Sequence, residues 1–197
     1  DAQFPLATVV VVAGSAARGT RTATSDIDLL LIGPDEMFTE GTDSLAASFA
    51  FDGEVFEVFA YTEDGFNRWA ARGVEQQRPV IVEMLVEGSA LRSGPELDGL
   101  LARWKPVFAR GPVSDPHELA MRRYVITDLL DDLTDSTDRL EQHVIMASLF
   151  EQLGGLLLVS NHRWIGAGKY LPRRLRAWDP ERTDQLAAPF LAGDVAG

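Results

Sequence analysis

The stretch Gly14 to Asp28 reads Gly-Ser-Ala-Ala-Arg-Gly-Thr-Arg-Thr-Ala-Thr-Ser-Asp-Ile-Asp, and apolar segments flank it on both sides. Residues 7–13 before it are rich in valine, and residues 29–32 after it are leucine and isoleucine. Apolar runs of this length between turn residues are typical of strands. The pattern therefore predicts a strand, a glycine-serine turn, a short crossover and a second strand that opens with Asp26 and Asp28.

Asp26 and Asp28 would lie on the same face of that strand, because side chains alternate between faces and Ile27 would turn into the core. Mg²⁺ prefers oxygen ligands and usually takes one or two carboxylates, with phosphate oxygens and waters completing its shell. Gly14 would let the backbone approach a phosphate, and Ser15 would offer it a hydroxyl and an N–H. The stretch therefore predicts a site for divalent cations and a polyphosphate.

Three groups of residues, Gly14-Ser15, Arg18-Gly19 and Ser25-Asp26-Ile27-Asp28, together resemble the signature of the DNA polymerase β-like nucleotidyltransferase superfamily. The similarity is greatest to its small-molecule and minimal branches, which include the aminoglycoside and lincosamide nucleotidyltransferases. The strand–turn–strand context agrees with the motif spacing, which makes the match more specific than a lone glycine motif. A surface Asp-x-Asp after a tight turn is the alternative interpretation.

The resemblance implies a role for each residue of the signature. Asp26 and Asp28 would be catalytic residues that bind two Mg²⁺ ions. The nucleotide, ATP or another NTP, would be bound by residues of the turn and the crossover, namely Gly14, Ser15, Arg18 and Ser25. Of these, Ser15 would cradle the β- and γ-phosphates.

A third metal-binding carboxylate is expected on the strand that residues 53–62 predict by their alternation and residue types. The resemblance places this carboxylate beside the Asp pair. Glu57 is the preferred catalytic residue and metal ligand, because it lies between apolar neighbours, where an unpaired carboxylate would be costly. Glu54, nearer the exposed start of the strand, is the alternative, and an ordinary surface glutamate is the third interpretation.

The remaining residues of the first half mix helix and strand patterns. Segments expected as helices are 42–49, 65–72 and 96–109, and segments expected as strands are 80–85 and 90–92. This mixture predicts an α+β fold: a polymerase β-like nucleotidyltransferase catalytic domain with a mixed β-sheet over residues 1–110, followed by a helical bundle. Gly111-Pro112-Val113-Ser114 marks the expected boundary.

Residues 111–197 are expected to form a helical accessory domain, as the resemblance to antibiotic-modifying relatives implies. Asp115 and Pro116 are typical of a helix start, with Asp as the cap and Pro at the first position. A second helix would follow Ser136–Asp138 and run toward Val159. Superfamily members usually carry a helix before the first strand, so segments are expected to be missing at one or both ends.

Two charged segments of this half are candidates for substrate binding. Acidic side chains gather at the junction of its first two helices, and indicate either a solvated junction or a pocket wall for an amine-bearing substrate: Asp131, Asp132, Asp135, Asp138 and Glu141. In several relatives a lysine of the helical domain reaches the triphosphate, and Lys169, after two glycines and before a helix, looks similar. Arg173 or Arg174 could take this role instead.

Composition limits the classes of partner. Thirty acidic against eighteen basic residues give a net charge of −12, so nucleic acid is not expected as a partner. Such a charge would attract a cationic acceptor, although solubility explains it equally well. The longest uninterrupted apolar runs, 7–13 and 153–159, are far shorter than the roughly 20 residues of a membrane span, so no membrane partner is expected. The chain contains no cysteine, and a cytoplasmic location is inferred from the nucleotide chemistry.

These observations predict a metal-dependent enzyme that transfers a nucleoside monophosphate, AMP from ATP, to a hydroxyl of a small molecule and releases pyrophosphate. Aminoglycoside-like and lincosamide-like antibiotics are the acceptors that the resemblance implies. The alternative is an antitoxin-like or regulatory module that keeps the fold and acts on a protein or RNA partner. Three converging acids favour the enzyme, and a homodimer is left open.

Overall fold

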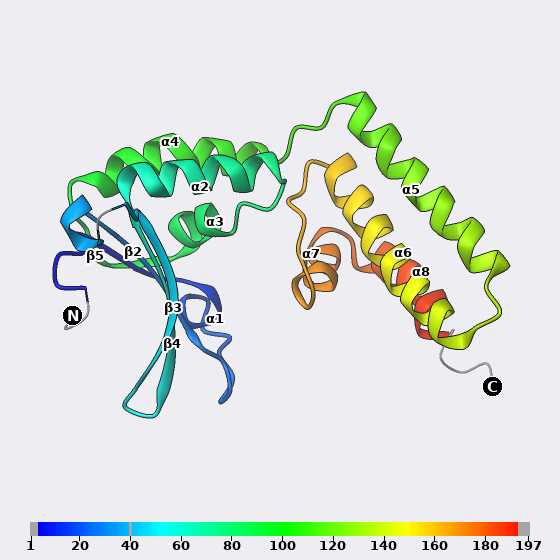
Figure 1. Ribbon diagram of the computed structural model, residues 1–197, viewed down its shortest axis with the longest axis horizontal. Coiled ribbons are helices and arrows are strands. Elements are labelled where there is room, and N and C mark those ends of the chain that lie inside the picture. The colour runs from blue at the N-terminus through cyan, green and yellow to red at the C-terminus, as the bar shows by residue number, and fades with distance from the viewer. Residues whose placement is uncertain (1–3, 40, 193–197) are drawn as a thin grey trace. The chain divides into compact units, whose positions relative to one another are not determined.

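The computed structural model describes residues 4–39 and 41–192, and the chain forms two compact units, Asp1–Arg110 and Gly111–Gly197. The first unit combines a five-stranded sheet with helices, and the described part of the second is helical (Figure 1). The expected fold class, α+β with a C-terminal helical region, is therefore confirmed.

The sheet of the first unit has the strand order β3-β4-β2-β1-β5. Strands β2 and β4 run parallel, and the other neighbouring pairs are antiparallel. The strand bounds are β1 (Val9–Val12), β2 (Ile27–Gly33), β3 (Ser44–Phe51), β4 (Glu54–Thr62) and β5 (Ser89–Arg92). The helical elements are α1 (Gly14–Ala17), the 3₁₀ turn η1 (Asp35–Met37), α2 (Glu63–Glu75), α3 (Val80–Glu87) and α4 (Glu96–Arg110).

Side-chain alternation along the strands builds two apolar clusters on opposite faces of the sheet. On one face, Leu30 and Ile32 of β2 pack with α2, α3 and α4, where Phe66 is fully buried. On the other face, Val58 and Ala60 of β4 pack with the segment before β1 and with residues around η1. Both faces of the central strands are therefore covered, which fixes which side chains of β2 and β4 share a face.

The helix expected over residues 42–49 was wrong, because this segment is strand β3. Asp52 and Gly53 have positive φ angles of 51° and 77°, and they join β3 to β4 in a hairpin whose first pair is Phe51 with Glu54. Asp-Gly is a favoured two-residue hairpin turn. Pairing along the whole of β4 outweighs the helix propensity of the three alanines in β3.

The strand expected over residues 80–85 was also wrong, because the segment belongs to helix α3. A short apolar run cannot be assigned to helix or strand by periodicity alone. In the structure Val82 and Leu85, three positions apart, are both buried on one face. The expected strands around 7–13, 53–62 and 90–92 and the expected helices 65–72 and 96–109 are confirmed as β1, β4, β5, α2 and α4.

The second unit contains α5 (Pro116–Asp135), α6 (Arg139–Ser160), α7 (Tyr170–Trp178) and α8 (Pro180–Ala192). The expected cap at Asp115 and the expected helix start after Ser136–Asp138 are confirmed. The Asp115 carboxylate accepts a hydrogen bond from the Glu118 N–H at 2.7 Å, and the Asp138 carboxylate accepts one from the Glu141 N–H at 2.9 Å. Side-chain acceptors at this position satisfy helix N–H groups that have no partner within the helix.

Among the described residues, α6 is the one helix whose length and apolar composition would suffice to cross a membrane, a test that core helices of soluble proteins also pass. The lengths of the uninterrupted apolar runs did not predict a helix that is long and apolar enough to span a membrane. Uncharged polar residues such as Ser148 and Gln152 interrupt those runs without adding charge.

The buried position of Phe66 predicts a large loss of stability on truncation. Phe66→Ala should lower the free energy of unfolding by about 3–5 kcal/mol, because the ring is fully enclosed by the core of the first unit. Phe51 is the matched control, since its ring is 73% exposed, and Phe51→Ala should change stability by no more than about 0.5 kcal/mol. Urea denaturation measures both, and equal losses would contradict the description of this core.

Candidate active site

Asp28 and Glu57 lie opposite each other on the neighbouring strands β2 and β4, whose parallel register pairs them directly. Paired residues of adjacent strands project from the same face of a sheet. Both residues are half-buried, and they share the face on which Leu30 and Phe59, two positions further along, meet the helix-covered core. The fold therefore places two carboxylates side by side at the edge of a packed core.

Gly14 lies directly against the Asp28 carboxylate. It begins α1 immediately after β1, with a φ of +61°, and a Cβ added there would lie 1.8 Å from Asp28 Oδ2. The neighbouring Ala13 N–H donates to the Asp28 carbonyl oxygen at 2.9 Å. This turn therefore requires glycine for its backbone angle and for the space that the carboxylate takes. Ser15 follows in α1, at the same turn.

Asp26 precedes strand β2, which begins at Ile27, so it belongs to the end of the preceding loop and does not open the strand as expected. That its side chain shares a face with Asp28 stays a prediction. Within residues 4–39 and 41–192, no three His, Cys, Asp or Glu residues are grouped closely enough to hold a metal ion. The structure thus brings Asp28 and Glu57 together, whereas it does not gather Asp26 with them into a three-ligand cluster.

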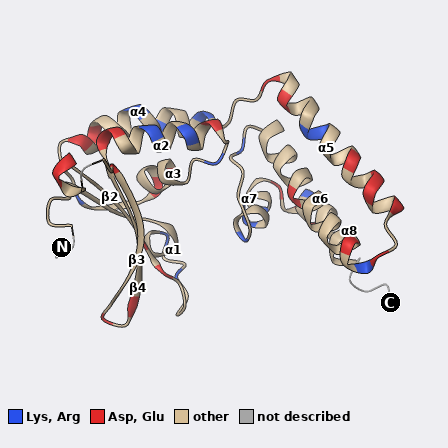
Figure 2. Ribbon diagram, viewed as in Figure 1, with Lys and Arg blue, Asp and Glu red and all other residues tan. Residues whose placement is uncertain are grey.

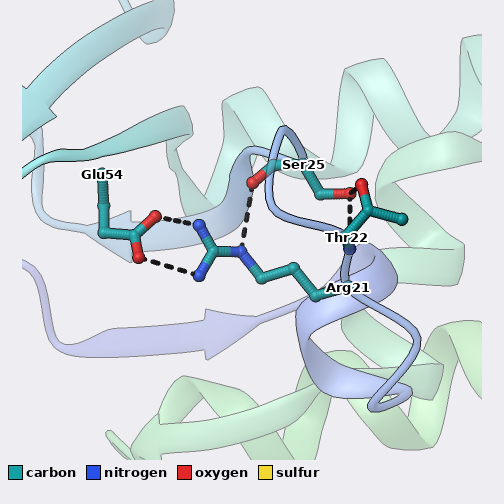
Figure 3. Close-up of polar contacts among 4 residues, drawn as sticks. All are labelled: Arg21, Thr22, Ser25 and Glu54. Carbon is teal, nitrogen blue, oxygen red and sulfur yellow. Dashed lines mark hydrogen bonds and ion pairs between the residues drawn. The ribbon is translucent and has the colours of Figure 1, made fainter.

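Glu54, the alternative third carboxylate, is engaged by an arginine of the loop before β2 (Figure 3). The Arg21 guanidinium forms a two-pronged ion pair with Glu54: Nη1 donates to Oε1 at 3.0 Å and Nη2 donates to Oε2. The hydrogen bond from Arg21 lowers the pKa of Glu54, and the same bond, aided by the charge of nearby Asp26, raises the pKa of Arg21. Glu54 therefore stays ionised as the partner of Arg21, while Glu57 lies in register with Asp28. The metal role of Glu57 stays a prediction.

The two other residues of the signature lie in the same loop. The Ser25 hydroxyl accepts a hydrogen bond from the Thr22 N–H at 3.0 Å and lies 2.8 Å from the Thr22 hydroxyl, so Ser25 closes a tight turn before Asp26. Arg18 lies at the end of α1, with Nη1 3.8 Å from Glu87 Oε2. Their nucleotide-binding roles stay predictions. The sequence analysis missed Arg21. Its partner Glu54 is 33 positions away, and no local sequence pattern predicts such a pair.

The charged residues of the second unit have contacts of their own. Lys169 is exposed at the start of α7, and its Nζ lies 5.5 Å from the centroid of the Tyr170 ring, a distance typical of a cation–π contact. Acidic residues lie along the C-terminal half of α5 (Figure 2). An open hollow of about 650 Å³ lies at the α5–α6 junction, lined by the acids Asp132, Asp135 and Glu141 and by apolar side chains of α6. The phosphate role of Lys169 and the substrate role of these acids stay predictions.

Residues 2–82 match the family model described as a nucleotidyltransferase domain. The matched segment includes the turn at Gly14, both aspartates and Glu57. No curated protein matches the chain. Among solved structures, the chain is similar to the crystal structure of a nucleotidyltransferase-like protein from Exiguobacterium sibiricum 255-15, at 14% sequence identity and a TM-score of 0.47. That match covers 94% of this chain and 61% of the other, so the chain spans less than two thirds of that protein.

Residues 2–82 are thus similar to a nucleotidyltransferase domain, and the α+β fold of the first unit agrees with this similarity. The finer resemblance to aminoglycoside and lincosamide enzymes stays a prediction. Nucleotidyltransferase domains generally use an NTP and divalent metal ions. Carboxylate oxygens are the donors that Mg²⁺ prefers, so the chemistry of Asp28 and Glu57 fits such an ion.

The contact between Gly14 and Asp28 predicts an energetic coupling between these two positions. Gly14→Ala should destabilise the fold less in an Asp28→Ala background than in the wild type, because the smaller side chain removes the clash. The coupling should be about 0.5–3 kcal/mol, as for residues in contact, and urea denaturation of the four proteins measures it.

Gly19 provides the matched control for this experiment. Its φ is also positive, at +66°, but no atom lies within 4 Å of an added Cβ. Gly19→Ala should therefore carry the backbone strain alone and show no coupling to Asp28→Ala. Equal coupling at both glycines would show that the close approach at Gly14 has no energetic consequence.

Proposed function

We propose that this protein is a metal-dependent nucleotidyltransferase that transfers AMP from ATP to a hydroxyl group of a small molecule and releases pyrophosphate. One observation carries the proposal. Inside the segment that matches the nucleotidyltransferase domain, the register of β2 and β4 pairs Asp28 with Glu57, and Gly14 packs against the Asp28 carboxylate. An Asp and a Glu on adjacent strands, beside a glycine-serine turn, match the chemistry of metal and triphosphate binding.

Asp28 and Glu57, with Asp26 from the adjoining loop, are the residues that would hold Mg²⁺. When bound, the metal supplies neutralisation of the triphosphate charge and of the charge that develops on the leaving pyrophosphate. The half-buried position of the two strand residues suits this role, because water screens a partly enclosed carboxylate less than an exposed one.

Residues of the glycine-serine turn and of β4 would bind the phosphates and accept the proton. Ser15 would donate its hydroxyl to a β- or γ-phosphate oxygen, and Gly14, which has no side chain, leaves its backbone accessible to the same phosphates. Glu57 would accept the proton of the acceptor hydroxyl as its oxygen attacks the α-phosphorus. The bond from that phosphorus to the bridging oxygen then breaks, and pyrophosphate leaves. Catalysis of this kind depends chiefly on positioning and on charge stabilisation.

The acceptor that we propose is a cationic, hydroxyl-bearing small molecule of the aminoglycoside or lincosamide type. The net charge of −12 would raise the local concentration of a cation. The acids that line the hollow at the α5–α6 junction offer a further attraction to amines. Adenylation of such an antibiotic would confer resistance on a cell that contains the enzyme in its cytoplasm.

The transfer reaction itself is the decisive test. The protein should be incubated with ATP and Mg²⁺ and a panel of aminoglycosides, lincosamides and hydroxyl-bearing metabolites, and mass spectrometry should detect a product heavier by one AMP. The double variant Asp26→Asn, Asp28→Asn should lose transfer while its circular dichroism spectrum stays that of the wild type. Asp35 and Asp52 are both exposed, so Asp35→Asn, Asp52→Asn is a charge-matched control that should keep full activity. Full transfer by the Asp26, Asp28 variant would contradict the proposed site, and modification of a protein or RNA instead would contradict the proposed acceptor.

The proposed phosphate role of Lys169 gives a separate prediction. Lys169→Ala should raise the KM for ATP by about ten- to a hundred-fold, because a hydrogen bond to a charged group contributes roughly 1.5–3 kcal/mol, and it should leave the KM for the acceptor nearly unchanged. Lys105, the one other lysine of the sequence, provides the control variant Lys105→Ala, which should leave both constants unchanged. Steady-state kinetics measures them, and an unaltered KM for ATP in Lys169→Ala would remove this residue from the nucleotide site.

A further inference from the structure

The loop that carries Asp26 is tied to strand β4 through Arg21, and we infer that Arg21 is a positioning residue that sets Asp26 relative to Asp28 and Glu57. The inference rests on the proposed function, in which these three acids act together. It assigns a role to an ion pair that the signature of the loop does not include, and it explains how an acid outside the strand can be held at a fixed place.

Asp26 needs such an anchor because the sheet does not supply one. The register of β2 with β4 begins at Ile27. Within the loop, the Ser25 N–H donates to the Thr22 carbonyl oxygen at 3.1 Å, and the Ser25 hydroxyl closes the same turn. These bonds shape the turn, and they join residues only three positions apart.

Arg21 makes the attachment with a single guanidinium group (Figure 3). Its Nε donates to the Ser25 carbonyl oxygen at 3.1 Å, at the peptide group that precedes Asp26. Its two Nη groups pair with the Glu54 carboxylate. A planar guanidinium with several fixed donors suits this geometry better than an ammonium group. One side chain therefore joins the residue before Asp26 to the strand that carries Glu57.

Glu54 is a suitable anchor point because β4 itself is firmly placed. Glu54 pairs with Phe51 across the β3–β4 hairpin, and Glu57, three residues later, pairs with Asp28. The loop that carries Asp26 and the Asp28–Glu57 pair are therefore both positioned by contacts with β4. A misplacement of about 1 Å in a reacting group can cost a hundred-fold in rate, so an anchored loop matters for the proposed reaction.

The pair is too exposed to be a general support of the fold. The Arg21 and Glu54 side chains are 29% and 42% exposed, and ion pairs at such sites typically contribute little to global stability. Arg21→Ala should therefore fold normally, and its effect should be confined to the loop. This separates a positioning role from a merely structural one.

The sign of the effect on metal binding is decisive. Arg21 carries a positive charge near Asp26, so removing it would by charge alone strengthen the binding of a cation. Loss of positioning predicts the opposite: Arg21→Ala should weaken the affinity for Mn²⁺, used as the probe in calorimetric titrations without nucleotide, by about tenfold, within the range of coupled contacts. The charge-swapped double variant Arg21→Glu, Glu54→Arg restores the ion pair but not the hydrogen bond to the Ser25 carbonyl, because a carboxylate cannot donate, so it should recover part of the lost affinity.

The matched control is Arg68, whose ion pair with Asp43 lies in the same unit. Arg68→Ala should leave Mn²⁺ affinity unchanged. Tighter Mn²⁺ binding by Arg21→Ala, or no recovery in the swapped variant, would overturn the inference, and the latter would point to Glu54 as a direct ligand.

Hydrogen–deuterium exchange tests the anchor independently of any metal. Amides of residues 21–27 should exchange faster in Arg21→Ala than in the wild type and in Arg68→Ala. Unchanged exchange in Arg21→Ala would overturn the inference even if the wild type binds Mn²⁺ well. A wild type that binds no Mn²⁺, together with faster loop exchange in Arg21→Ala, would instead contradict the proposed function and support the anchor.

Discussion

The parallel pairing of β2 with β4 is the constraint on which the candidate site depends. The chain leaves β2 at Gly33, forms β3 and turns at Asp52-Gly53, so that β4 returns beside β2 in the same direction. Because side chains alternate with a period of two, a slip of one residue would move Glu57 to the opposite face from Asp28. Seven consecutive pairs hold the register, from Ile27 to Gly33.

Burial on both faces explains why this register is strict. Leu30 and Ile32 face the helices, whereas Leu31 faces the second cluster with Val58 and Ala60. A one-residue slip of β4 would exchange its side chains between these two clusters, and it would carry the Glu57 carboxylate toward the apolar second cluster, where an unpaired charge is costly. The packing that stabilises the sheet is thus also what orients the two acids.

The sequence predicted those parts of the fold that local patterns encode. Alternation identified β4 and put Glu57 on one face, and the glycine-serine turn identified Gly14. Local patterns predicted the wrong secondary structure for two segments. Residues 44–51, with their alanines, form a strand because the Asp52-Gly53 turn folds them onto β4. Residues 80–87 form a helix that buries Val82, Met84 and Leu85. In each case tertiary pairing or packing decided between two locally plausible structures.

The two aspartates of the signature differ in what holds them. Asp28 is fixed by the sheet, through its register with Glu57 and its contact with Gly14, so its place follows from strand geometry that a sequence can reveal. Asp26 lies one residue before the strand and its paired residues, and sites on loops are less exact than sites on strands unless other residues support them. The Arg21–Glu54 pair supplies this support from a residue 33 positions away. An Asp-x-Asp motif read along the sequence suggests two equivalent ligands, whereas the fold gives one acid a rigid strand and leaves the other to depend on a single guanidinium.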